Sequence, residues 1–112
     1  MTIVRIEDIT LDQTAALFVG REHGANVSFF IVSCRRGEGP DPHRHPYEET
    51  FVVQEGMAEF TVDGDTFEVV AGSIVVAPAG AVHNFKGAFD GVTRQVNIHP
   101  VAEMVTEWVD ET

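Results

Sequence analysis

The chain has 112 residues, 44% of them hydrophobic, which suits one domain spanning residues 1–112 around a single buried core. Eighteen acidic residues against seven basic ones leave a net charge of −11, and this field repels phosphate backbones and anionic lipid. We therefore expect neither nucleic acid nor a membrane as a partner, and no apolar run approaches the ~18 residues that a membrane-spanning helix needs.

Cysteine usage and the first residues predict the compartment. Cys34 is the only cysteine, so the chain cannot form an internal disulfide, and a reducing cytoplasm is the expected location. Residues 1–8 lack the basic and apolar regions of a signal peptide, which favours the same location. Because Cys34 lies in an apolar run, it is more typical of a small core residue than of a reactive thiol.

The first third of the chain contains three apolar segments. Residues 3–6 and 15–19 are short and separated by polar residues, so they predict two edge strands. Residues 27–34 are rich in β-branched and aromatic side chains and predict a longer strand. Residues 21–26 have the composition of a turn, and we interpret His23 within it as an exposed loop residue and not as a ligand.

From residue 49 onward, short apolar segments are punctuated by glycine and proline. The predicted strands are residues 49–55, 57–63, 66–70, 73–77, 82–86 and 93–99. The alternation of apolar and polar residues places Phe60 inward on one strand, and Phe67 and Val69 inward on the next. Short strands at this spacing are typical of an all-β sandwich or barrel.

The hydrophobic period changes after Pro100. Val101, Met104, Val105 and Trp108 fall at positions i, i+3, i+4 and i+7, the stripe of an amphipathic helix. Pro100 can begin a helix without losing a needed donor. We predict a short C-terminal helix over residues 101–109, packed on the outside of the barrel, with a partner-binding face as the alternative use of the stripe.

Two stretches carry candidate metal ligands. His43, His45 and Glu49 share a parity, so in an extended segment all three point to the same side. His83 follows an apolar run and a Pro-x-Gly turn, from which a loop can present it to the first stretch. Glu48 competes with Glu49 as the carboxylate, but it has the wrong parity. Three imidazoles and one carboxylate predict a metal site inside a small β-barrel.

The same two stretches carry a spaced pattern. The first, from Gly37 to Gly56, reads G-x5-H-x-H-x3-E-x6-G, and the second, from Gly72 to His83, reads G-x5-P-x-G-x2-H. In this order they resemble the two signature motifs of the cupin superfamily. The resemblance covers roughly residues 25–100. It implies a small, single-domain, bacterial-type metal-binding cupin whose fold is a double-stranded β-helix, or jelly-roll barrel.

The resemblance also assigns roles to individual residues. It implies that the metal ligands are His43, His45, Glu49 and His83. One departure is visible at Gly87, where family members often carry asparagine. That position is usually part of a turn and not a ligand, so the ligand assignment is unchanged.

The donor set predicts the cofactor and the surroundings of the site. Three nitrogens and one oxygen without thiolate suit one divalent transition metal per chain, such as Fe, Mn, Ni or Zn. A six-coordinate ion keeps two positions open for water, O2 or a chelating substrate. Phe51 and Phe85 are expected to line the pocket, with ordinary core packing as their alternative role. His99 is either an acid/base group at the pocket or, as we favour, a structural residue before the following helix.

Because cupins include dioxygenases, isomerases, lyases and small-ligand sensors, the resemblance implies two classes of function. The first is an oxidoreductase, a dioxygenase-like enzyme acting on a small oxygen-bearing organic molecule, with Glu49 available to leave the metal and accept a proton. The second is a metal-chelating isomerase or lyase, or a non-catalytic module that binds a small molecule. Exposed strand edges favour pairing between chains, and we expect a homodimer.

Overall fold

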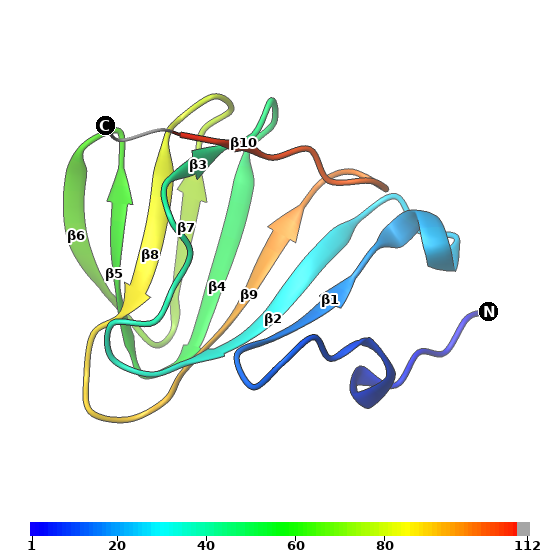
Figure 1. Cartoon of the computed structure of the whole chain (residues 1–112), viewed down its shortest axis with the longest axis horizontal. Coiled ribbons are helices and arrows are strands. Elements are labelled where there is room, and N and C mark those ends of the chain that lie inside the picture. The colour runs from blue at the N-terminus through cyan, green and yellow to red at the C-terminus, as the bar shows by residue number, and fades with distance from the viewer. Residues whose placement is uncertain (110–112) are drawn as a thin grey trace.

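The computed structural model describes residues 1–109, which form ten strands in two five-stranded sheets (Figure 1). The first sheet has the order β1-β2-β9-β4-β7 and the second β10-β3-β8-β5-β6. The pairs of strands within both sheets are antiparallel, which confirms the all-β class. The strands are β1 (Ala15–Phe18), β2 (Ser28–Cys34), β3 (His43–Arg44), β4 (Glu49–Glu55), β5 (Met57–Val62), β6 (Asp65–Val70), β7 (Ser73–Ala77), β8 (His83–Gly87), β9 (Thr93–His99) and β10 (Glu107–Trp108).

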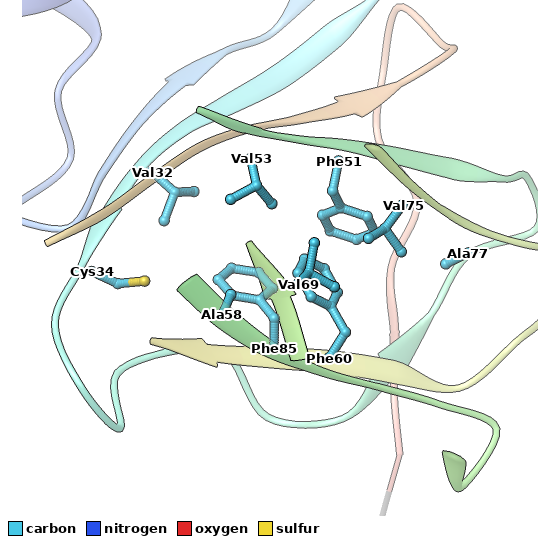
Figure 2. Packing of buried hydrophobic residues seen from close by; sticks show 10 residues of the cluster. All are labelled: Val32, Cys34, Phe51, Val53, Ala58, Phe60, Val69, Val75, Ala77 and Phe85. Carbon is cyan, nitrogen blue, oxygen red and sulfur yellow. The ribbon is translucent and has the colours of Figure 1, made fainter. Parts of the chain in front are cut away.

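The hydrophobic core fills the space between the two sheets (Figure 2). Phe51 on β4 and Phe60 on β5 meet edge to face, with ring centroids 5.0 Å apart. Phe85 on β8 packs against both rings, and each of these aromatic side chains contributes about 1.5–3 kcal/mol by its burial. Val69 is buried as expected, whereas Phe67 is 41% exposed. The reason is that β6 is an edge strand, so no neighbouring strand covers that end of the core.

The N-terminal segment differs from the expectation at one of its two predicted edge strands. β1 forms and lies at the edge of its sheet, which confirms the second one. The prediction of a strand over residues 3–6 is wrong, because the last of these residues, Ile6, already begins the 3-10 helix η1 (Ile6–Ile9). The turn predicted over residues 21–26 overlaps the 3-10 helix η2 (Gly20–His23). No helix in the described part of the chain is long and apolar enough to cross a membrane.

The predicted C-terminal helix over residues 101–109 is wrong. Residues 101–103 form a bend, and β10 then pairs with β3 across one end of the barrel (Figure 1). Backbone groups that a helix would pair internally are bonded elsewhere: Ala102 O accepts from Arg21 N–H, and Val109 N–H donates to Pro42 O. A helix of this length is marginal without packing, and Trp108 remains 63% exposed.

Candidate metal centre

Three short elements at one end of the barrel present the candidate ligands. His43 begins β3, Glu49 begins β4 and His83 begins β8, while His45 follows β3 directly. His43 and His83 are direct cross-strand partners, which brings the two sequence stretches together. The turn before His83 is tied to the first stretch, because Gly80 N–H donates to His45 O at 2.8 Å.

The four ligand atoms converge in a buried cluster. One atom each from His43, His45, Glu49 and His83 lies within 4.8 Å of the other three. The four residues are 2–8% exposed. Glu48, the rival carboxylate, is exposed, so the structure brings Glu49 and not Glu48 to the cluster. This group of donors can hold a metal ion.

Hydrogen bonds to backbone carbonyls orient the three imidazoles. Nδ1 of His43 lies 2.8 Å from Asp41 O, Nδ1 of His45 lies 2.8 Å from Val105 O, and Nδ1 of His83 lies 2.9 Å from Ala81 O. A carbonyl oxygen can only accept, so the hydrogen of each ring sits on Nδ1. In the neutral ring Nε2 then carries the lone pair, which is the arrangement that metal-binding histidines use.

Glu49 completes the donor set and shows why a cation fits. Its Oε1 lies 3.0 Å from Nε2 of His45 and 2.9 Å from Nε2 of His83. If both nitrogens carry lone pairs, three acceptor atoms face one another, and this arrangement is favourable only with a proton or a metal ion among them. The ligands are nitrogen and oxygen without thiolate, which suits a divalent transition metal.

The electrostatics of the ion-free site follow from the same contacts. Burial acts to raise the pKa of Glu49, but hydrogen bonds from three imidazoles outweigh it and hold the pKa well below the usual 4.5. For His83, burial is the largest influence and acts to lower the pKa, but the hydrogen bonds to Glu49 and Ala81 O and the charges of Glu49 and Asp63 together outweigh it, so the net pKa is raised. Burial lowers the pKa of His43. Protons and metal thus compete for the same place, so metal affinity should fall as the pH falls.

His99 belongs to this site, whereas the structural role at a helix start that we favoured from the sequence is wrong. Its Nε2 lies 3.2 Å from Glu49 Oε2, and its Nδ1 lies 2.7 Å from the hydroxyl of Tyr47. Tyr47 was missed by the sequence analysis. Tyr47 lies two residues from both His45 and Glu49 in the sequence, and this spacing was sufficient to place it on the same side of an extended segment.

A cavity of about 530 Å³ lies beside the cluster. His43, His45, Glu49 and His99 form part of its wall, so a small molecule in the cavity can reach the ligand atoms. The apolar part of the wall comprises Ala15, Phe30, Val32, Cys34, Pro40, Phe85 and Trp108.

The expected pocket residues therefore divide into two groups. Phe85 and His99 line the cavity, whereas Phe51 lies in the hydrophobic core with its ring centroid 5.8 Å from that of His83. Phe51 therefore has the alternative role, core packing behind the ligands. His23 lies outside the cluster of ligands, where its ring stacks on Phe18 at 4.7 Å.

The sequence matches a known protein family and two curated relatives. The family described as "Cupin domain" matches residues 30–100. A curated relative, "Polyketide synthase CurC" of Streptomyces cyaneus, is 37% identical over 82 residues, covering 70% of this chain and 53% of the relative. A second, "Uncharacterized protein SCO3923" of Streptomyces coelicolor, is 32% identical over 65 residues, covering 58% and 60%. The chain thus spans little more than half the length of these relatives.

Solved structures share the fold at low sequence identity. A cupin-like protein from Thermotoga maritima has a TM-score of 0.74 and 23% identity, covering 85% of this chain and 74% of that one. Oxalate decarboxylase of Bacillus subtilis, which has Mn(II) centres, has a TM-score of 0.80 and 18% identity, covering 94% of this chain and 31% of that one. These likenesses confirm a double-stranded β-helix.

Proposed function

The chain belongs to the cupin family, and on that basis we propose that it is a metal-dependent enzyme acting on a small oxygen-bearing organic molecule. The observation that carries the proposal is the common orientation of three imidazoles. His43, His45 and His83 each hydrogen-bond a backbone carbonyl through Nδ1, and one ligand atom of each ring lies within 4.8 Å of a Glu49 oxygen. Such a set of free nitrogen lone pairs around a buried carboxylate has a metal ion as its natural occupant.

The metal would be held by these four residues, one ion per chain, with Fe, Mn, Ni or Zn as the candidates. When bound, such an ion supplies Lewis acidity and a fixed point for the oxygen atoms of a substrate. The residues of the chain do the rest: they orient the substrate, exclude water from it and hold protons at defined atoms.

The cavity supports a substrate with an apolar body and polar oxygens at one end. Phe30, Val32 and Phe85 offer apolar contact, while the ligand cluster lies at the polar end. Asn97 also lines the cavity, and because its Oδ1 accepts from Gln95, its NH2 group is the part left for a ligand. The name of the Streptomyces cyaneus relative favours a polyketide-like substrate, a class rich in enol and ketone oxygens.

The first candidate reaction is a dioxygenase-like oxidation of an enol or diol. Glu49 is the residue we assign to accept the substrate proton, since it is a buried carboxylate in the cavity wall beside the other candidate ligands. The test is elemental analysis of protein purified without added metal, followed by oxygen-electrode measurements with catechols and cyclic enols. We expect about one transition-metal ion per chain and oxygen uptake that matches substrate loss.

The second candidate is a non-oxidative isomerase or lyase that uses the same metal site, or a module that only binds its ligand. It is favoured by His99, which lines the cavity beside Glu49 and whose ring contacts the hydroxyl of Tyr47, so that a further proton-handling group faces the cavity. Zinc or nickel in the purified protein, with substrate converted to an isomer in the absence of oxygen, would support this candidate and contradict the first.

A further inference from the structure

We propose that His99 is a positioning residue that holds Glu49 so that only one carboxylate oxygen, Oε1, faces the metal. This inference rests on the proposed metal-dependent function and concerns the same site. It requires His99 to carry its ring hydrogen on Nε2, the opposite tautomer from the three ligand histidines.

A chain of hydrogen bonds sets the tautomer of His99. Val105 N–H donates to the hydroxyl of Tyr47 at 3.1 Å, so this oxygen already serves as an acceptor. The single hydroxyl hydrogen of Tyr47 has two possible acceptors, His99 Nδ1 at 2.7 Å and Val105 O at 3.4 Å. The shorter distance assigns the hydrogen to His99 Nδ1. His99 Nδ1 is therefore an acceptor, and the ring hydrogen sits on Nε2.

The other end of the ring agrees with this assignment. His99 Nε2 lies 3.2 Å from Glu49 Oε2. With a hydrogen on Nε2 this contact is a hydrogen bond to a buried carboxylate, whereas with the hydrogen on Nδ1 two acceptors would face each other. A metal ion would not bridge these two acceptors, because His99 is outside the metal-ligand cluster. Among residues 1–109, the mutually close ligand atoms belong to His43, His45, Glu49 and His83.

The consequence concerns how Glu49 binds the ion. Both side chains are 2–3% exposed, so the bond between His99 and Oε2 is largely shielded from water. Oε1, in contrast, faces His45 and His83 at 3.0 and 2.9 Å. A carboxylate with Oε2 engaged in this way gives the ion one oxygen, and a coordination position that a bidentate carboxylate would occupy stays open for substrate.

The test uses zinc-loaded protein and two measurements that do not depend on activity. Long-range ¹H–¹⁵N NMR spectra report the tautomer of each histidine ring. We expect hydrogen on Nε2 for His99 and on Nδ1 for His43, His45 and His83. Zinc competition with a chelator then gives the affinity of Tyr47→Phe and His99→Phe, which we expect to be about 10- to 100-fold lower, as for other residues that orient metal ligands.

Two further variants separate positioning from packing. His99→Gln retains an N–H donor near Oε2 and should recover part of the affinity that His99→Phe loses. Phe30→Leu alters the apolar packing against His99, whose ring centroid lies 6.0 Å from that of Phe30, and should leave the zinc affinity unchanged.

The failures of the two proposals are distinguishable. If the wild-type protein binds zinc but His99 carries its hydrogen on Nδ1, or if Tyr47→Phe and His99→Phe bind zinc as tightly as wild type, the positioning role is overturned and the metal site stands. If the wild-type protein binds none of zinc, manganese, iron and nickel, the proposed function and the positioning role are both overturned.

Discussion

The backbone carbonyl of Val105 accepts a hydrogen bond from Nδ1 of His45 at 2.8 Å, across 60 positions of the sequence. The amide of the same residue donates to Tyr47, which in turn contacts His99. Val105 therefore acts on the site in two ways. Its carbonyl orients the candidate ligand His45, and its amide holds Tyr47, which contacts His99 beside Glu49. The segment that crosses the barrel end is part of the metal centre.

We predict that ending the chain after Glu103 lowers metal affinity about 10- to 100-fold, because the acceptor of His45 and the donor to Tyr47 are both lost. The β-sheet signal in circular dichroism should persist, since β10 contributes a ladder of only two residue pairs. The matched control is Glu107→Gln, which breaks an exposed ion pair with Arg44 and should leave metal affinity as in the full chain. Equal metal affinity in the truncated and full chains would show that the C-terminal segment does not contribute to the metal centre.

Removing one ligand should abolish most metal binding. We predict at least a tenfold loss of affinity in His83→Ala by isothermal titration, because the remaining imidazoles and Glu49 are then left with an incomplete donor set. His23→Ala is the control, since His23 lies outside the cluster. Wild-type protein should gain about 2.7 kcal/mol of stability at a metal concentration 100 times its Kd, whereas His83→Ala should gain at most about 1.4 kcal/mol at that concentration. A similar gain in both would argue against the site.

The Cys34 thiol should react slowly in the folded protein. Burial, followed by the charge of Glu38, raises the pKa of Cys34 above its usual 9.0. The reactive thiolate is the form favoured above the pKa, so at pH 8 the folded protein holds less than about a tenth of Cys34 as thiolate. We expect reaction with a thiol reagent to be at least tenfold slower than in the unfolded chain, and its rate to keep rising with pH beyond 9, because the raised pKa moves the plateau of thiolate formation upward. Equal rates at pH 8 would show that Cys34 is accessible and activated.

The core and the edge of the second sheet offer a matched pair of aromatic substitutions. Phe60 is 1% exposed and its cross-strand partner Phe67 is 41% exposed. We predict that Phe60→Ala lowers the free energy of unfolding by about 3–5 kcal/mol, because it leaves a cavity between the sheets. Phe67→Ala should lower the free energy of unfolding by clearly less than Phe60→Ala does. Chemical denaturation of both variants measures the difference, and equal losses would contradict this account of the core.

We predict that the protein forms a homodimer through the outer face of the first sheet. Ile74, Val52, Val96 and Ile31 are successive cross-strand partners on that face, alternating with the buried residues. Such a row of apolar side chains at a sheet surface favours pairing with a second copy. Light scattering should give twice the chain mass, and Val52→Glu should give a lower mass. Glu59→Gln changes an exposed position of the other sheet and should leave the measured mass unchanged. A monomeric wild-type protein would contradict the prediction.

Much of this protein follows from the order of its residues. The period-2 alternation identifies the strands after residue 49, because every second side chain of a half-buried strand must be apolar. The spacing of His43, His45 and Glu49 predicts that they share a face, because alternate side chains of an extended segment point to the same side. The Pro-x-Gly turn indicates that His83, the fourth donor, can be presented to them. These features are local, so sequence alone was sufficient to find them.

The tertiary structure decided the features that depend on long-range pairing. The stripe from Val101 to Trp108 satisfies the period of a helix, yet its backbone groups bond to Arg21, His45 and Pro42, and contacts of this kind leave no trace in local periodicity. The place of His99 was decided in the same way, since β9 lies beside β4 in the sheet and carries the ring to Glu49. Local spacing predicts which side a residue faces, whereas the order of strands in the sheet determines which residue it meets.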